Sequence, residues 1–264
     1  MIDYNMSMED YLAHPAYNAS KLKLMLKTSL DFKEGLDDAN SETKSTILGT
    51  ALHTLLLEPK EFNQRYALQS EDFGKKNAGE GKKKWDAFKK ANNDKIVLGK
   101  TESDFLLKFK ARKNPAFRLL VASGDAEVTG ILEDEIIPRK ARADLLNDDT
   151  IYDVKSSIDG MDDTSIYRTI KRYKYDFSAA HYMTVFNKLF PDRFKKYCWV
   201  FADTDSPAQH LRIIRCPEIM LKRALYEYES VINKLEYCIA KDTWEGYPKH
   251  ETELELPHWA EELK

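Results

Sequence analysis

The alternation of apolar and polar residues is clearest in one stretch near the middle of the chain. Residues 141–146 and 151–156 are short strand-like runs, and the polar turn 147–150 separates them. Turn-forming residues between two such runs are typical of a β-hairpin. With Asp148 and Asp149 as a two-residue loop, the strands pair in a fixed register.

This register places Asn147 opposite Thr150, and the same count sets Asp144 opposite Asp153 and Arg142 opposite Lys155. Because side chains alternate along a strand, one hairpin face would carry this charged group, and the other would carry Ala143, Leu145, Tyr152 and Val154 as core. Opposed side chains have Cβ atoms roughly 5 Å apart, and like charges there are destabilising. Two carboxylates in this arrangement favour a cation between them.

Asp144 and Asp153 are therefore candidate ligands of a hard divalent cation. Mg²⁺ takes oxygen ligands, commonly one or two carboxylates together with phosphate and water. Lys155 would lie beside such an ion, where its ammonium can orient or deprotonate a water molecule or stabilise negative charge. This layout suits phosphodiester hydrolysis. The alternative is an exposed hairpin face with solvated charges, because two aspartates and a lysine at this spacing have low specificity.

Helical periodicity dominates the first part of the chain. It predicts one helix from Asn18 to about residue 36, a second over residues 45–58, and two more between Trp85 and Phe109. The glycine- and lysine-rich stretch 70–84 has no hydrophobic period and predicts a loop, whose lysines contact either solvent or a phosphate backbone. Strands are expected after the pair Asn114-Pro115.

The second part predicts an α/β core. Residues 126–132 and the hairpin form a three-stranded meander. A long helix opens at Pro217, with an apolar stripe beginning at Ile219. Further helices are predicted at 159–172 and 175–190, and further strands at 197–202 and 210–216. We expect one domain, with a helical portion at about 1–115, a catalytic α/β core at about 116–216, and a C-terminal helix and tail at 217–264.

Composition and charge narrow the class of protein. The 264 residues are 42% hydrophobic, which allows an ample core, and the net charge of -3 argues against a generally basic surface but permits a local positive stripe. Three cysteines without C-x-x-C spacing favour a reduced, intracellular protein. No signal-like N-terminus and no apolar run near the ~20 residues of a membrane span occur. The expected location is the cytoplasm of a host cell.

The order of several motifs resembles the exodeoxyribonuclease VIII (RecE-type) phage recombination nucleases of the PD-(D/E)XK superfamily. The motifs are YLAHPAYNASKLKLMLKTSLDF, GTALHTLLLEPKEF, AEVTGILEDE, KARADLL, IYDVKSS, YKYDFSAAHY and WEGYP. This resemblance implies a restriction-endonuclease-like core, with a central mixed sheet containing an antiparallel meander and flanked by helices. It also implies Mg²⁺, with Mn²⁺ as a substitute, and 5′ to 3′ degradation of linear double-stranded DNA from its ends, leaving 3′ overhangs. The implied partners are identical subunits in a ring-like trimer or tetramer and a single-strand annealing protein, encoded by a phage or prophage in a bacterial cell.

The resemblance also assigns roles to individual residues. His53 alone, on an apolar helix, suits an ordinary core histidine, but the Gly49–His53 motif matches a metal-ligating histidine beside the two aspartates and the Val154 carbonyl. Lys155 matches the catalytic lysine. Glu127 matches an acidic residue that holds a second metal or a water molecule, although a surface glutamate is an equal alternative. Tyr182 matches a tyrosine near the DNA end, while Ser178 stands where the family usually has glutamine.

Positive side chains beside an acidic metal cluster suit a phosphodiester substrate. The predicted DNA contacts are Arg142, Ser178, Arg168, Lys171 and Arg172. Cations near residue 172 also suit an ordinary helix C-terminus. Two other functions fit the pattern: another PD-(D/E)XK enzyme, either an endonuclease or a single-strand exonuclease in repair or defence, and a non-catalytic DNA-binding protein of the same fold. The non-catalytic alternative would be marked by loss of Asp144, Asp153 or Lys155, and all three are present.

Overall fold

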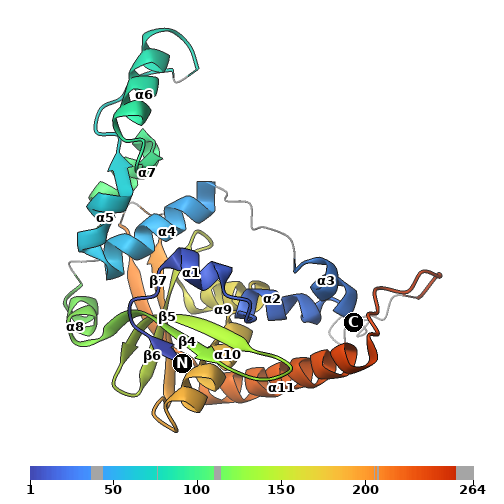
Figure 1. Cartoon of the computed structure of the whole chain (residues 1–264). Coiled ribbons are helices and arrows are strands. Elements are labelled where there is room, and N and C mark those ends of the chain that lie inside the picture. Colours follow the sequence, from blue (N-terminus) through green and yellow to red (C-terminus); the bar gives the residue numbers. More distant parts are fainter. Residues whose placement is uncertain (37–43, 76, 110–113, 205, 207, 254–264) are drawn as a thin grey trace, which may run out of the picture.

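A six-stranded sheet forms the centre of the molecule (Figure 1). The computed structural model describes residues 1–36, 44–75, 77–109, 114–204, 206 and 208–253. The strand order is β1-β4-β5-β6-β7-β8, and each neighbouring pair is antiparallel except β6 with β7. The strands are β1 (Ile2–Asp3), β4 (Asp125–Leu132), β5 (Arg139–Asn147), β6 (Thr150–Ser157), β7 (Lys196–Asp203) and β8 (Leu211–Arg215). The predicted class, a mixed sheet with an antiparallel meander flanked by helices, is confirmed.

Helices cover both faces of this sheet. On one face, Trp199 and Phe201 of β7 belong to a core shared with α9 (Asp163–Arg172) and α10 (Tyr175–Leu189). On the other face, Val200 belongs to a core shared with three helices: α4 (Lys44–Leu57), α5 (Pro59–Arg65) and α8 (Pro115–Ser123). The alternation of side chains along β7 therefore supplies both cores.

A third core joins α10 to the long C-terminal helix α11 (Glu218–Lys241). Phe177 of α10 and Tyr228 of α11 pack in it with residues of the N-terminal segment. His181 is fully buried there, with Nε2 2.9 Å from the Lys140 carbonyl oxygen and Nδ1 3.2 Å from the Tyr228 hydroxyl. These contacts make His181 a structural residue, and burial lowers its pKa to about 4.

A buried lysine fixes the N-terminal helix α1 (Met8–Ala13) against the sheet. Lys140 Nζ donates to the carbonyl oxygens of Tyr11 at 2.5 Å and His14 at 2.7 Å, where α1 ends. The last carbonyls of a helix lack partners within it and carry partial negative charge, so a cation there is favourable. Lys140 thereby holds Tyr11 beside the sheet.

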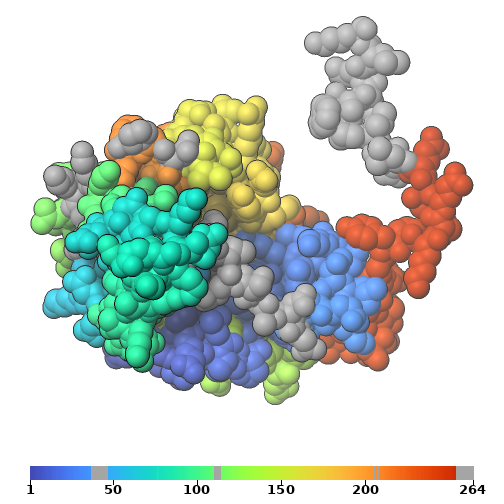
Figure 2. Space-filling view, turned by 90° about the horizontal axis from the view of Figure 1, so that it is seen from above, coloured from blue at the N-terminus to red at the C-terminus, as the bar shows by residue number. Residues whose placement is uncertain are grey.

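The segment between α5 and α8 projects from the body as an arm (Figure 1). It consists of β2 (Tyr66–Leu68), α6 (Gly79–Ala91), β3 (Ile96–Leu98) and α7 (Lys100–Lys108), and β2 pairs in parallel with β3. Figure 2 looks onto this arm, in teal and green, and shows the dark-blue N-terminal residues and the yellow residues around α9 exposed on the same side of the molecule.

Several predicted boundaries were wrong. The predicted loop 70–84 is partly helical, because α6 begins at Gly79, and residue 76 lies outside the described residues. Asn114 and Pro115 begin α8 instead of a β region: Pro115 occupies the first turn, and the Asn114 side chain accepts a hydrogen bond from Phe117 N. The single helix expected from Asn18 is divided into α2 (Ala19–Leu22), the 3₁₀ helix η1 (Lys23–Leu26) and α3 (Ser29–Glu34), since Thr28 caps a new helix.

The C-terminal region differs from the prediction in one respect. Ile219, the first residue of the expected apolar stripe, is 62% exposed, and the buried face of α11 begins at Ala224. After α11, Trp244 stacks on Phe32 of α3 with ring centroids 6.1 Å apart. Residues 254–264 of the predicted tail lie outside the described residues. The three cysteines are buried and unpaired, and within the described part of the chain no helix is long and apolar enough to span a bilayer.

Candidate active site

The hairpin of β5 and β6 opens where the two aspartates lie. Asn147 pairs with Thr150 as predicted, and pairing continues to Leu145 with Tyr152 but goes no further. At the next position the Asp144 side chain replaces the backbone ladder, because its Oδ2 accepts a hydrogen bond from Val154 N at 2.6 Å. Beyond this point β6 continues to pair with β7 along its length. The two hairpin strands therefore separate at the charged residues.

A left-handed residue in β4 changes which face its neighbours occupy. Glu127 has φ +56°, and its pairing with β5 is interrupted although the flanking residues Ala126 and Val128 stay in register. Non-glycine residues seldom adopt this conformation in a strand. Before the kink, Ala126 packs in the core beneath α4, and after it Val128 packs in the core beneath α10.

The predicted apolar face of the hairpin was therefore partly wrong. Ala143 lies in the core beneath α10, whereas Leu145, Tyr152 and Val154 lie in the core beneath α4. Strict alternation would keep Ala143 and Leu145 on one face, but the sheet is distorted between them, at Asp144 beside Glu127. The distortion places the carboxylates of Glu127 and Asp144 in the lining of one cavity.

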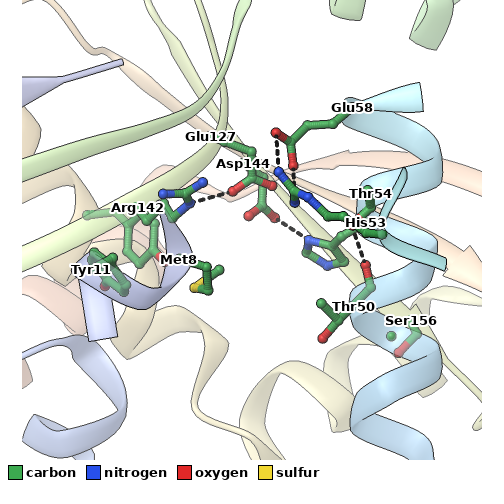
Figure 3. Close-up of a pocket in the computed structure, with 13 residues that line it drawn as sticks. Met8, Tyr11, Thr50, His53, Thr54, Glu58, Glu127, Arg142, Asp144 and Ser156 are labelled. Carbon is green, nitrogen blue, oxygen red and sulfur yellow. Dashed lines mark hydrogen bonds and ion pairs between the residues drawn. The ribbon is translucent and has the colours of Figure 1, made fainter. Parts of the chain in front are cut away.

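His53 of α4 faces these carboxylates across the cavity (Figure 3). Ligand atoms of His53, Glu127 and Asp144 lie within 4.8 Å of one another, and His53 Nδ1 is 3.6 Å from Asp144 Oδ2. Gly49 lies one helical turn before His53. A glycine is not required there to let the helix backbone approach the site closely. A Cβ there would meet only Ser156 Oγ, at an ordinary contact distance of 3.9 Å.

The electrostatics of this group suit a cation. Burial, followed by repulsion from Asp153, raises the pKa of Asp144 to about 8. Burial and the nearby Asp144 also raise the pKa of Glu127. Burial and the nearby Lys155 lower the pKa of His53, so its imidazole is neutral at neutral pH and its lone pair is available to a metal. A divalent cation would relieve the repulsion between the carboxylates.

Arg142 holds Glu127 in place. Its Nε donates to Glu127 Oε2 at 2.7 Å, and one terminal nitrogen donates to the Met6 carbonyl oxygen at 2.6 Å. Both side chains of this ion pair are nearly buried, with 9% of Arg142 and 12% of Glu127 exposed. The predicted position of Arg142 opposite Lys155 is therefore replaced by a contact with the neighbouring strand.

Removing the guanidinium should destabilise the protein. We expect Arg142→Met to lower the free energy of unfolding by about 3 kcal/mol at pH 8, because a buried carboxylate loses its partner. The loss should be smaller at pH 5, where the raised pKa of Glu127 favours its neutral form. Urea unfolding at both pH values measures this. Arg215→Met, on the exposed side of β8, is the matched control, and equal losses for both variants would contradict the assigned role.

Asp153 and Lys155 form a second charged pair beside Asp144. Lys155 Nζ donates to Asp153 Oδ1 at 2.5 Å and lies 5.2 Å from the ring centroid of Tyr175. Burial alone would disfavour the ammonium, but attraction to Asp153 and Asp144 outweighs it and raises the pKa of Lys155. Lys23 of η1 shares the Tyr175 ring, at 5.6 Å, and burial together with repulsion from Lys155 lowers its pKa to about 8.

The other predicted residues occupy different surroundings. Tyr182 lines the cavity, whereas Ser178 is buried, with its Oγ 3.5 Å from the Lys174 carbonyl oxygen. Arg168 is exposed on α9. Lys171 Nζ binds Asp176 Oδ2 at 2.6 Å, and Arg172 lies 3.9 Å from Asp159. Ser178, Arg168, Lys171 and Arg172 are thus outside the lining of this cavity.

Sequence patterns missed part of the lining of the cavity, which has a volume of about 480 Å³. The missed residues are Met8, Tyr11, Thr50, Thr54, Glu58, Arg65 and Ser156. Tyr11 is held at the cavity by the contact between Lys140 and the end of α1, and no local sequence pattern predicts that contact. Thr50 could have been found, because it lies three residues before His53 on the same helix, and Thr54 follows Thr50 by one further turn of four residues.

The donor set fits a divalent cation. Asp153 Oδ2 is buried and has no hydrogen-bond partner among the described residues, which is costly unless another group satisfies it. The backbone of Val154 also lies beside His53, where it opposes the lowering of the pKa of the imidazole. Carboxylate, carbonyl and neutral imidazole groups together are typical ligands of such ions.

Comparison with known proteins supports a nuclease fold. Residues 18–252 match the family described as "PDDEXK-like domain of unknown function (DUF3799)". The chain is similar to the crystal structure of a "Putative exonuclease" from Eubacterium rectale, with 15% identity, a TM-score of 0.62 and 96% of each chain covered. It also matches a phage related exonuclease from Haemophilus somnus 129PT, with 13% identity, a TM-score of 0.35, and 88% of this chain and 99% of that chain covered. No curated protein gives a significant match.

Proposed function

The chain belongs to the PDDEXK-like family DUF3799, within the PD-(D/E)XK nuclease superfamily, and from this premise we propose that it is a divalent-metal-dependent exodeoxyribonuclease. The observation that carries the proposal is the opened hairpin, where His53, Glu127 and Asp144 converge beside the Asp153–Lys155 pair. The substrate is the end of linear double-stranded DNA. The resemblance to the exodeoxyribonuclease VIII family supports 5′ to 3′ polarity and 3′ overhangs for recombination by single-strand annealing.

The metal ligands are His53, Asp144, Asp153 and the Val154 carbonyl, with Glu127 adding a further carboxylate. Mg²⁺ is the expected ion, and Mn²⁺ should substitute for it. When bound, the cation polarises the scissile phosphate and offsets negative charge on the leaving oxygen. Lys155 is fixed by Asp153 and keeps its proton, so it orients the attacking water and stabilises charge on the phosphate rather than accepting a proton.

The reaction is hydrolysis of one phosphodiester bond. A water oxygen forms a bond to phosphorus as the bond to the leaving nucleoside oxygen breaks, and that oxygen then takes a proton from solvent. Glu127 suits the role of proton acceptor, since its pKa is raised by burial and its position is fixed by Arg142. Tyr182 lines the cavity from α10, where its hydroxyl contacts the substrate phosphate.

The predicted DNA contacts divide into two groups. Arg168 and Arg172 are exposed cations and contact the DNA backbone. Arg142 holds Glu127 within the site, whereas Lys171 is paired with Asp176 and Ser178 is buried, both outside the lining of the cavity. Recombination by this route further requires an annealing protein as partner, and the family resemblance supports a ring of identical subunits acting in the bacterial cytoplasm.

The first test is digestion of an end-labelled linear duplex. We expect nucleotides to be released progressively with Mg²⁺ or Mn²⁺ and no release with chelator, because the carboxylate cluster then lacks its cation. Separate 5′ and 3′ labels report the polarity, and a covalently closed circle of the same sequence serves as control. Cutting of the circle would indicate an endonuclease, digestion of single strands alone a single-strand exonuclease, and binding without hydrolysis a non-catalytic protein.

A further inference from the structure

A second cavity adjoins the proposed active site. Its volume is about 210 Å³, smaller than the roughly 300–1,000 Å³ of sites that enclose a whole drug-sized ligand. Ser156 lines both cavities. Tyr175 also lines the second cavity, and Lys155 Nζ lies over its ring, so a DNA strand bound at Lys155 can continue directly into this second cavity. The other lining residues are Ser157, Ile158, Asp159, Thr169, Tyr173 and Tyr175.

An aromatic stack connects this cavity to the lysine of the active site. The rings of Tyr173 and Tyr175 are stacked, with centroids 5.6 Å apart and planes inclined by 23°. Lys155 Nζ lies over the Tyr175 ring at one end of the stack. At the other end, the Arg172 guanidinium lies 5.4 Å from the centroid of Tyr173. The stack therefore runs from the half-buried lysine of the proposed active site to the surface.

The surface end of this stack has the character of a binding site. Tyr173 is 46% exposed and Ile158 is 69% exposed, so two large apolar side chains of one small cavity face solvent. Thr169 also lines the cavity, and its buried hydroxyl has no hydrogen-bond partner among the residues that the structure describes. Apolar surface open to water and an unpartnered hydroxyl together favour a ligand with one flat apolar part and one polar part.

The Arg172 side chain can move away from the Tyr173 ring when such a ligand binds. Its side chain is 69% exposed, and its ion pair with Asp159 is long, at 3.9 Å. A surface pair of this kind contributes little stability. Arginine also binds phosphate through two parallel hydrogen bonds. The guanidinium can therefore exchange the Tyr173 ring for a DNA phosphate at small cost.

We propose that Tyr173, backed by Tyr175, is a stacking platform for one unpaired base of the DNA strand next to the scissile phosphate. The proposal rests on the proposed function and adds a nucleotide subsite to it. The sugar and its phosphate face Ser157 and Thr169, and Arg172 binds the flanking phosphate. Since a base stacked in so small a cavity cannot stay paired with its complement, the duplex opens by at least one base pair beside the cut.

The test removes the platform and the base separately. Tyr173→Ala should lower kcat/KM on a duplex about tenfold, in line with the measured strength of base stacking on aromatic side chains, whereas Tyr173→Phe should keep nearly full activity. An abasic nucleotide beside the scissile bond should slow the wild-type protein by a similar factor. The abasic substrate should slow Tyr173→Ala no further, so that the variant and the wild-type protein digest it at nearly equal rates, because the two changes remove the same contact.

Tyr167→Ala is the matched control, because Tyr167 is an exposed tyrosine on α9, the helix that Tyr173 follows directly, and lies outside the cavity. Losses that simply multiply in Tyr173→Ala on the abasic substrate, or full activity of this variant, would overturn the platform. Affinity for a single-stranded oligonucleotide, measured with chelator so that nothing is cut, separates this outcome from failure of the proposed function. Suppose that the wild-type protein never hydrolyses DNA but binds the oligonucleotide about tenfold more tightly than Tyr173→Ala does. This result would support the nucleotide subsite and overturn the proposed nuclease activity.

Discussion

Replacing Lys155 by alanine is expected to slow DNA hydrolysis at saturating Mg²⁺ by roughly 10²- to 10³-fold. The ammonium is half-buried: it is held at 2.5 Å by Asp153 and lies over the ring of Tyr175. A charge preorganised in this way beside a phosphate stabilises the transition state without reorganising, and losses of this size follow removal of one such group. Time courses of nucleotide release from a labelled duplex measure the effect.

Folding has to be checked in the same experiment, because Asp153 loses its partner in this variant. Lys155→Met keeps most of the side-chain volume and should be equally inactive, while circular dichroism with Mg²⁺ present should match the wild-type protein. Lys196→Ala is the matched control: Lys196 also pairs with an aspartate of the hairpin, Asp149, but on the exposed side of the sheet. A folded Lys155 variant that digests DNA within tenfold of the wild-type rate would exclude Lys155 from the mechanism.

Asp144→Asn is expected to abolish metal-dependent digestion and to stabilise the metal-free protein at pH 8. Asparagine keeps an oxygen that can accept the hydrogen bond from Val154 N, but it carries no charge. In the wild-type protein, burial and then repulsion from Asp153 raise the pKa of Asp144 from 3.8 to about 8. The ionised carboxylate is therefore unfavourable in the folded state.

The direction in which stability changes with pH follows from proton binding by Asp144. Between about pH 4 and pH 8 the folded protein holds a proton on Asp144 that the unfolded chain has released, so stability falls as the pH rises through this window. The amide of the Asp144→Asn variant does not titrate in this range. We expect the variant to gain on the order of 5 °C in melting temperature at pH 8 and almost nothing at pH 4.

Metal addition supplies the complementary measurement. Mg²⁺ should raise the melting temperature of the wild-type protein at pH 8, because binding to the folded state alone stabilises it. The same addition should leave Asp144→Asn nearly unchanged. Asp149→Asn is the control, since Lys196 lowers the pKa of that exposed carboxyl and its removal should give no gain. A variant less stable than the wild-type protein at both pH values would contradict the role assigned to Asp144.

The hairpin could be predicted because its turn and the start of its register depend on local rules. A two-residue loop fixes the register. Counting along both strands from that loop places Asp144 and Asp153 at opposed positions. The role of His53 required the motif as well, since a histidine on an apolar helix has no distinctive local pattern. The broad division into helices, meander and C-terminal helix follows from the same periodicities.

Other parts of the site depend on contacts that no local pattern encodes. Glu127 is left-handed and breaks the alternation of side chains along β4, but it is not a glycine, so the sequence gives no sign of the break. The faces of Ala143 and Leu145 could therefore not be assigned correctly. Tyr11 and Lys23 come from the N-terminal segment, more than a hundred residues from the hairpin. Asn114-Pro115 was ambiguous for a different reason: this pair is equally a turn signal and a helix start, and only packing against the sheet selects the helix.

The conformation of Glu127 carries a cost that its ion pair offsets. A side chain at φ +56° costs on the order of 1 kcal/mol that glycine would not incur. Glycine at this position would leave the nearly buried guanidinium of Arg142 without its partner, which costs about 3 kcal/mol. An evolution experiment that rewards only survival at high temperature would therefore keep the carboxylate, as would one that rewards DNA turnover, and glycine would enter only together with a replacement of Arg142. Sequencing both populations would show whether the two positions change together.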